Sequence, residues 1–150
     1  YASPRRTATG VGTNRLHQIL AVIEKHVGLT LSRYDCYLAV AGGLEVEEPA
    51  SDLGIAVAVV SSFKERTLPV GTVLIGELGL GGQLRSVAQV EQRLLEVERL
   101  GFSRAIIPKG NVSKSIYKEL HLELLEASTV KEAINLALGD GLNEKLDSTY

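Results

Sequence analysis

The hydrophobic pattern of the chain begins with one amphipathic helix. Between residue 12 and Gly28, five apolar residues recur every three or four positions, which is the spacing of one helix face. These residues are Leu16, Ile19, Leu20, Ile23 and Val27. Thr13 or Asn14 is expected to cap the start of this helix, and Gly28 is expected to end it.

Alternating positions and short apolar runs predict strands. Cys36, Leu38 and Val40 fall on one side of an extended segment, and a glycine pair follows. Further along, Gly81 and Gly82 separate two apolar segments, which is typical of two antiparallel strands joined by a tight turn. The predicted strands span residues 34–41, 72–80, 82–87, 104–108 and 122–127.

Three further segments predict helices. Residues 52–63 are apolar nearly all round, so periodicity cannot separate a buried strand from a buried helix, and their length favours a helix. Residues 90–100 and 128–139 are amphipathic, and the last segment carries a capping signal. The side chains expected inside are Val90, Leu94, Val97 and Leu100, then Val130, Ile134, Ala137 and Leu138. Because strands and helices are interleaved, the predicted class is α/β, in an α+β two-layer arrangement.

The length and composition indicate one globular core. A chain of 150 residues with 45% hydrophobic and 23% charged residues is large enough to bury a sizeable core and lacks the polar bias of disorder. We expect an arm or linker at residues 1–11, one domain at 12–139 and a frayed tail at 140–150. The chain starts with tyrosine and contains no methionine, which indicates a piece of a longer protein.

Several kinds of site are disfavoured by the sequence. The glycine-rich segment 76–85 lacks the Gly-Lys-Ser/Thr ending of a phosphate cradle, so we expect a hairpin and no bound ATP. The three histidines, His17, His26 and His121, are scattered, so no metal site is predicted. The single cysteine, Cys36, cannot form an internal disulfide and is expected to be a packed thiol. No apolar run of membrane-spanning length and no leader is found, and we expect a cytoplasmic protein without membrane contact.

Ser51 raises the question of nucleophilic catalysis, because it lies between Pro49 and Asp52 just before the apolar run. A serine hydroxyl needs a neighbouring base to attack, and a lysine serves only if burial lowers its pKa. Lys64 would lie beyond the far end of the following helix. We therefore favour a helix N-cap over a nucleophile for Ser51.

The motifs of the chain resemble a known family. "PRRTATG", "NRLHQILAVIEKHVGL", "AGGLEVEEPASDLGIAVAVVSS", "IGELGLGGQLRSV", "QRLLEVERLGF" and "RAIIPKGN" follow in unbroken order between Arg5 and Gly139. Together they resemble the C-terminal domain of the bacterial RadA (Sms) family of DNA-repair proteins. That domain is in turn similar to the proteolytic domain of Lon protease, and the resemblance implies a Lon-like fold.

The comparison with Lon implies that the catalytic positions are substituted. Setting Pro49 on the proline of Lon's Gly-Pro-Ser-Ala-Gly motif places Ala50 at the nucleophile and Ser51 one position late. Aligning "LLEV" with the corresponding leucines of Lon places Glu91 at the catalytic lysine. A methyl group and a carboxylate cannot replace a serine and lysine pair. We therefore expect no catalytic residues and a domain that is not an enzyme.

The resemblance also implies what the whole protein does. RadA-like proteins carry a zinc finger and a RecA-like ATPase, so zinc, ATP and Mg are expected only in domains missing from this chain. They form hexameric rings, resembling helicase or branch-migration factors, that act on single-stranded DNA and recombination intermediates. The domain is expected to be an oligomerisation scaffold with a DNA-binding surface in DNA repair and recombination. The alternatives are a module that docks a recombination partner, such as a RecA-type recombinase, and a Ser-Lys peptidase.

Basic residues are the candidates for DNA contact. The net charge is -2, but the segments 2–33 and 85–118 lean basic. The candidates for a DNA-facing ring surface are Arg15, Arg85, Arg93, Arg104 and Lys109. Arg5 and Arg6 lie in the expected arm, where they would serve an interdomain contact, DNA or solubility. Taken individually, each of the five ring-surface candidates is better explained as an ordinary surface charge.

Overall fold

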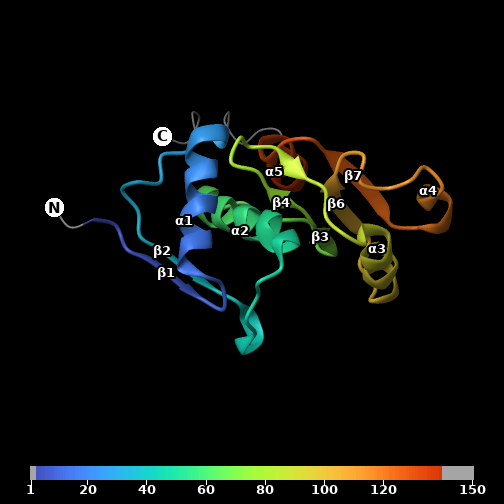
Figure 1. The fold of residues 1–150 in the computed structure, drawn as a ribbon, viewed down its shortest axis with the longest axis horizontal. Helices are drawn as coiled ribbons and strands as arrows, with labels where there is room; N and C mark the ends of the chain where they lie inside the picture. The colour runs from blue at the N-terminus through green and yellow to red at the C-terminus, as the bar shows by residue number, and fades with distance from the viewer. Residues whose placement is uncertain (1–2, 140–150) are drawn as a thin grey trace.

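The computed structural model describes residues 3–139, and the tail expected at 140–150 lies outside the described residues. Strands and helices alternate along the chain, which confirms the α/β class (Figure 1). Along the long axis of the molecule, the N-terminal strands β1 (Arg6–Thr9) and β2 (Cys36–Ala39) lie toward one end. The helices α3 (Val90–Arg99) and α4 (Ile116–Glu119) lie toward the other.

A parallel three-stranded sheet forms the middle of the fold. Its strands are β3 (Thr72–Leu74), β6 (Arg104–Pro108) and β7 (Glu123–Ala127), in the order β3-β6-β7. Leu74 of β3 pairs with Ile106 of β6, which pairs with Leu125 of β7. The apolar runs at 104–108 and 122–127 therefore form strands, as predicted.

Helices cover both faces of this sheet. Ile106 points into one buried cluster with α2 (Asp52–Lys64) and α5 (Val130–Leu138). Its neighbours Ala105 and Ile107 point into a second cluster with α3 (Val90–Arg99) and α4 (Ile116–Glu119). Because successive side chains of a strand alternate, β6 contributes to both cores. The helices thus form layers on both faces of this sheet rather than on one.

The helix predictions hold, with two corrections at helix ends. α1 (Thr13–Val22) continues into the π-helical turn η1 (Ile23–Val27) and ends at Gly28, whose φ is 85°. Its N-cap is Gly12 and not Thr13 or Asn14, because the amide of Leu16 already donates to the Gly12 carbonyl. Leu100 is 66% exposed and not inward, since α3 ends at Arg99 and the chain turns away there.

The expected arm at residues 1–11 contains a strand instead. β1 (Arg6–Thr9) pairs in parallel with β2 (Cys36–Ala39), after which the short helix η2 (Ala41–Gly43) follows. The polar sequence "RTAT" forms a strand because its backbone is paired along the register from Arg6 and Cys36 to Thr9 and Ala39. Ala8 also packs against the first core.

The glycine-rich segment forms a hairpin, as predicted, but a shorter one. β4 (Glu77–Leu78) and β5 (Leu84–Arg85) are antiparallel. Residues 72–74, expected in the same hairpin, form β3 of the parallel sheet. Gly82 closes the turn with a φ of 82°, a left-handed conformation that glycine adopts without strain. Its carbonyl accepts the amide of Val130, which ties the hairpin to the start of α5.

Candidate functional site

The two positions expected to have lost their catalytic groups, Ala50 and Glu91, lie on elements that share the second core. Ala50 belongs to η3 (Pro49–Ser51), is 5% exposed and shares the second core with Val90 at the start of α3. Its carbonyl accepts the amide of Gly76 at 2.9 Å. The methyl group of Ala50 therefore faces apolar side chains and offers no atom for nucleophilic attack.

Ser51 does not act as predicted. It occupies the N-cap position of α2, but its hydroxyl does not cap the helix. The hydroxyl instead donates to the Glu48 carbonyl at 2.6 Å, because η3 folds the serine back over the preceding turn. Lys64 lies at the other end of α2, about 20 Å along the helix axis at 1.5 Å per residue. No base among the described residues is hydrogen-bonded to the Ser51 hydroxyl.

Glu91 has a structural partner in place of a catalytic one. It lies in the first turn of α3, where a carboxylate interacts favourably with the positive end of the helix dipole. Its Oε2 accepts the amide of Ser113 at 2.8 Å. Nearby, the side chain of Asn111 bonds both the amide and the carbonyl of Val87, at 2.8 and 3.1 Å. These bonds fix the 109–115 loop against the segment that leads into α3.

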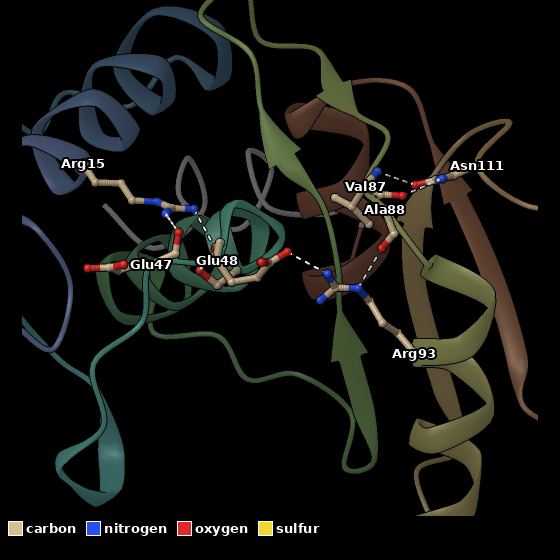
Figure 2. A network of polar contacts seen from close by, with 8 residues as sticks. Arg15, Glu47, Glu48, Val87, Ala88, Arg93 and Asn111 are labelled. Carbon is tan, nitrogen blue, oxygen red and sulfur yellow. Dashed lines mark hydrogen bonds and ion pairs between the residues drawn. The ribbon is translucent and has the colours of Figure 1, made fainter.

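Two arginines hold the loop before Ala50 from opposite sides, as Figure 2 shows. Arg15 of α1 donates to the carbonyls of Glu47 at 3.1 Å and Glu48 at 2.9 Å. Arg93 of α3 forms an ion pair with the Glu48 carboxylate at 2.7 Å and also donates to the Ala88 carbonyl at 3.0 Å. The loop before Ala50 is thus joined to α1 by Arg15 and to α3 by Arg93.

Asp52 is a buried acid that sequence reasoning did not assign. It is 7% exposed, the one buried charged residue within 3–139, and forms an ion pair with Arg15. Its Oδ2 also accepts the amide of Leu78 at 3.0 Å, so three elements, α1, α2 and β4, meet at one carboxylate. The available signal was an acid at the start of an apolar helix, which does not identify its distant partner.

A cleft of about 390 Å³ opens beside this ion pair. It lies between α1, the start of α2 and the β4-β5 hairpin, and Arg15, Asp52 and Arg85 are among its lining residues. The Arg85 side chain is 60% exposed, and its Nε lies 3.6 Å from Glu77. Two predicted DNA-contacting residues thus share this cleft, but only Arg85 presents its guanidinium to solvent.

The other basic candidates lie apart. Arg104 on β6 donates to the Leu136 carbonyl at 2.8 Å, and its Nε lies 3.2 Å from the Glu123 carboxylate without hydrogen-bond geometry. Lys109 follows β6 and is exposed. Arg6 donates to the carbonyls of Tyr34 and Leu31. The structure therefore does not gather Arg15, Arg85, Arg93, Arg104 and Lys109 into one patch.

Cys36 is a packed thiol, as predicted. It packs against the first core from β2. Burial raises the pKa of the Cys36 thiol above its ordinary value, although the nearby Arg6 charge acts in the opposite direction. The protonated thiol is thereby favoured, which is the unreactive form.

Residues 3–139 contain neither a metal-binding cluster nor a membrane-spanning helix. Within this range, no group of three or more histidine, cysteine, aspartate or glutamate side chains is placed to hold a metal ion. None of the helices between residues 3 and 139 combines the length and the apolar character that a membrane span requires.

Glu126 binds both Tyr117 and the 109–115 loop, which Glu91 also contacts. The Tyr117 phenol donates to Glu126, whose other oxygen accepts the amide of Gly110 at 2.9 Å. Burial raises the pKa of Tyr117 to about 12, and the hydrogen bond to Glu126 and its negative charge add to the rise. The folded protein favours the neutral phenol, so this contribution to stability is present below pH 10.0 and is lost as the pH rises through about 12.

We expect Glu126→Gln to lower the pKa of Tyr117 toward its ordinary value of 10.0, because the substitution removes the negative charge. Ultraviolet difference absorbance follows tyrosine ionisation, and Tyr117→Phe assigns the transition. Glu123→Gln, on the same strand β7, is the control and should leave the transition in place. An unchanged Tyr117 transition in Glu126→Gln would show that the carboxylate has no part in the shift.

The chain is similar to known proteins. Residues 12–111 match the family described as subunit ChlI of Mg-chelatase. Among curated relatives, DNA repair protein RadA of Synechocystis sp. is 51% identical over 92% of this chain, and DNA repair protein RadA of Halalkalibacterium halodurans is 44% identical over 93%. DNA repair protein RadA of Bacillus subtilis is 42% identical over 93%. The matches cover 27%, 30% and 30% of these relatives, so the chain spans less than a third of their length.

Proposed function

The chain belongs to the family described as subunit ChlI of Mg-chelatase, and from this premise we propose that it is a non-proteolytic, Lon-like domain of a DNA repair protein. Its relatives named DNA repair protein RadA support a role in DNA repair and recombination. The domain acts there as an oligomerisation scaffold that also offers a surface to DNA. It corresponds to the C-terminal domain of such a protein.

The observation that carries the non-proteolytic proposal is that neither Ala50 nor Glu91 offers a catalytic group. Ala50 is buried among apolar side chains, and Glu91 is engaged by the Ser113 amide. Acyl transfer by a serine and lysine pair needs a hydroxyl within hydrogen-bond reach of an amine. Ser51 instead donates to the Glu48 carbonyl. Covalent labelling of Ser51 by a fluorophosphonate would contradict this proposal.

The remaining parts of the parent protein supply the motor chemistry in this proposal. The chain covers less than a third of its relatives, so ATP, Mg and zinc are assigned to the rest of the protein and not to this domain. The assembled form is a hexamer in the cytoplasm. Its partners are single-stranded DNA, recombination intermediates and a RecA-type recombinase.

Arg85 and Lys109 are the basic candidates that best suit DNA contact. Both are exposed, and the contact of Arg85 with Glu77 is long at 3.6 Å, whereas Arg15, Arg93 and Arg104 bond the protein's own carbonyls and carboxylates at shorter distances. A cation whose donors are already occupied gains little from a phosphate, since it must first release its partner. Six copies of this exposed pair in a ring would sum into a basic field.

Binding to a fluorescein-labelled oligothymidylate tests the DNA role. We expect the wild-type chain to bind with an affinity that falls as salt rises, because phosphate contacts release counterions. The double variant Arg85→Glu with Lys109→Glu should reduce the slope of log affinity against log salt by about 1.4, or 0.7 for each lost contact. Fluorescence anisotropy across a salt series measures this slope.

The matched control is the double variant Arg99→Glu with Lys131→Glu. Arg99 of α3 and Lys131 of α5 are exposed cations elsewhere in the fold, so this variant has the same net charge as the test variant. It should keep the wild-type slope. Equal losses in both double variants would show that only net charge matters, and absent binding by the wild-type chain would remove the DNA role.

A further inference from the structure

A groove lies between β2 and α2. Its volume is about 820 Å³. Leu38, Val59 and Phe63 give it apolar walls, and Tyr34 and Tyr37 stand beside it with 54% and 64% of their surfaces exposed. β2, which lines the groove, lies toward one end of the molecule, and α3 lies toward the other (Figure 1).

β2 presents an unpaired backbone edge to this groove. The amides of Cys36 and Val40 donate to the β1 carbonyls of Arg5 at 2.8 Å and Thr9 at 3.0 Å. Because peptide groups alternate in direction along a strand, those of Tyr37 and Ala39 point away from β1. Within residues 3–139, the β1-β2 sheet has no third strand. The outward N–H and C=O groups of Tyr37 and Ala39 therefore form a template for a further strand.

The surroundings of the groove carry positive charge that carboxylates do not neutralise. Arg5, Arg6 and Arg33 form no ion pair within residues 3–139. The arginines that do form ion pairs are Arg15, Arg85, Arg93, Arg99 and Arg104. Asp35 is the one acidic residue that lines the groove, and its Oδ1 accepts the backbone amide of Arg5 at 2.7 Å. An occupant with negative charge is thus favoured.

We propose that this groove binds an extended acidic peptide from a partner protein, which adds to β2 as a third strand. A strand about 4.8 Å from β2 would pair with the peptide groups of Tyr37 and Ala39. Its inward side chains, every second residue, would be apolar and would pack on Val59 and Phe63 of α2. Its acidic side chains would lie near Arg6, which lines the groove, and Arg33, which precedes the lining residue Tyr34 in the chain.

A peptide accounts for more of the groove than a nucleic acid does. Single-stranded DNA would use the tyrosine rings and the positive charge. It has no row of alternating amide donors and acceptors to pair with the β2 edge. It also has no aliphatic side chains that would pack on Leu38 and Val59. The inference does not depend on the DNA role proposed above.

Nuclear magnetic resonance with isotope-labelled protein tests this inference. The probe is a pool of acetylated, amidated nonapeptides in which Val, Leu, Phe or Tyr alternates with Asp, Glu or Thr. We expect the pool to shift the amide signals of Tyr37 and Ala39 at concentrations up to about 1 mM, the weak end of specific binding. A pool with lysine in place of the acidic residues should bind at least about tenfold more weakly, because it meets like charge.

Three substitutions separate the parts of the groove. Ala39→Pro removes one outward amide, which edge strands tolerate because that amide has no internal partner. Ala58→Glu places a carboxylate on the exposed, groove-lining side of α2. We expect each of these to weaken peptide binding at least about tenfold, since each removes or repels a main contact. Arg33→Glu should weaken it less, and Lys131→Glu on α5, the control, should not weaken it. Signal dispersion in the same spectra shows that each variant is folded.

Several results would overturn the inference. One is a peptide pool that leaves the Tyr37 and Ala39 signals unchanged. Another is equal affinity of wild type and of both folded variants, Ala39→Pro and Ala58→Glu. A third is an oligothymidylate that shifts these signals while the peptides do not. Self-association that light scattering detects in the wild type but not in Ala39→Pro would assign the groove to a second copy of the chain instead.

Discussion

Replacing Arg15 by alanine is expected to lower the free energy of unfolding by about 3 kcal/mol, since it leaves a buried carboxylate without its cation. The side chain of Arg15 is only 20% exposed and that of Asp52 10%, so solvent cannot replace the lost partner fully. The variant also frees the carbonyls of Glu47 and Glu48. Urea unfolding followed by circular dichroism measures the change.

Two comparison variants isolate the buried ion pair. Arg85→Ala removes an exposed cation 3.6 Å from Glu77 and should cost at most about 1 kcal/mol. Arg15→Met combined with Asp52→Leu removes both charges and should recover part of the loss. Recovery stays incomplete because the Leu78 amide loses its acceptor, at a cost of about 1 to 3 kcal/mol. Equal stability of Arg15→Ala and Arg85→Ala would contradict the buried ion pair.

This result also bears on DNA binding by Arg15. Reversing its charge would place a carboxylate against Asp52, so lost DNA affinity in such a variant would follow from lost folding. Arg85 lines the same cleft but is 60% exposed, and it can be reversed without disturbing the buried pair. The clean tests of the DNA surface therefore use Arg85 and Lys109.

Gly82→Ala is expected to destabilise the protein by about 3 kcal/mol, which combines left-handed backbone strain with overpacking. The φ of Gly82 is 82°, and a Cβ there would lie 2.6 Å from Cγ and 2.8 Å from Cβ of His26. The near part of a side chain cannot move aside without moving η1. Thermal unfolding measures the loss.

Gly101→Ala is the matched control for Gly82→Ala. Its φ of 96° also disfavours alanine, but nothing lies within 4 Å of the added Cβ. We expect a loss of about 1 kcal/mol, from backbone strain alone. A Gly82→Ala variant no less stable than Gly101→Ala would mean that the hairpin does not pack tightly on His26.

Elements with local signals were predictable from the sequence. α5 combines an amphipathic pattern with Thr129, whose hydroxyl accepts the Glu132 amide at 3.1 Å. β6 is a short apolar run that ends at Pro108. In both cases the residues that determine the structure lie within a few positions of each other.

Elements that depend on distant pairing were not predictable. β1 has a polar sequence, and it is a strand only because Arg6 pairs with Cys36, thirty residues later. The local pattern predicts β3 as part of the hairpin because its apolar run continues toward β4, whereas its partner β6 lies 32 residues further on. Backbone pairing leaves no trace in the local pattern of either segment.

The candidate site shows the same limit. Family resemblance led to Ala50 and Glu91, and their surroundings support the proposal that neither takes part in catalysis. The charges of Arg15, Arg93 and Arg104 were visible in the sequence, but their carboxylate and carbonyl partners were not. For this reason their predicted role at a DNA surface is weakened, and that of the exposed Arg85 and Lys109 is not.

The position of β6 between two cores has a consequence for how the domain comes apart. Ile106 contributes to one hydrophobic cluster, and Ala105 and Ile107 contribute to the other. Disorder in one cluster would displace β6 and so remove side chains that pack in the other cluster, because both clusters use side chains of this one strand. We therefore expect the two halves to unfold cooperatively as a single unit, although each has its own set of helices.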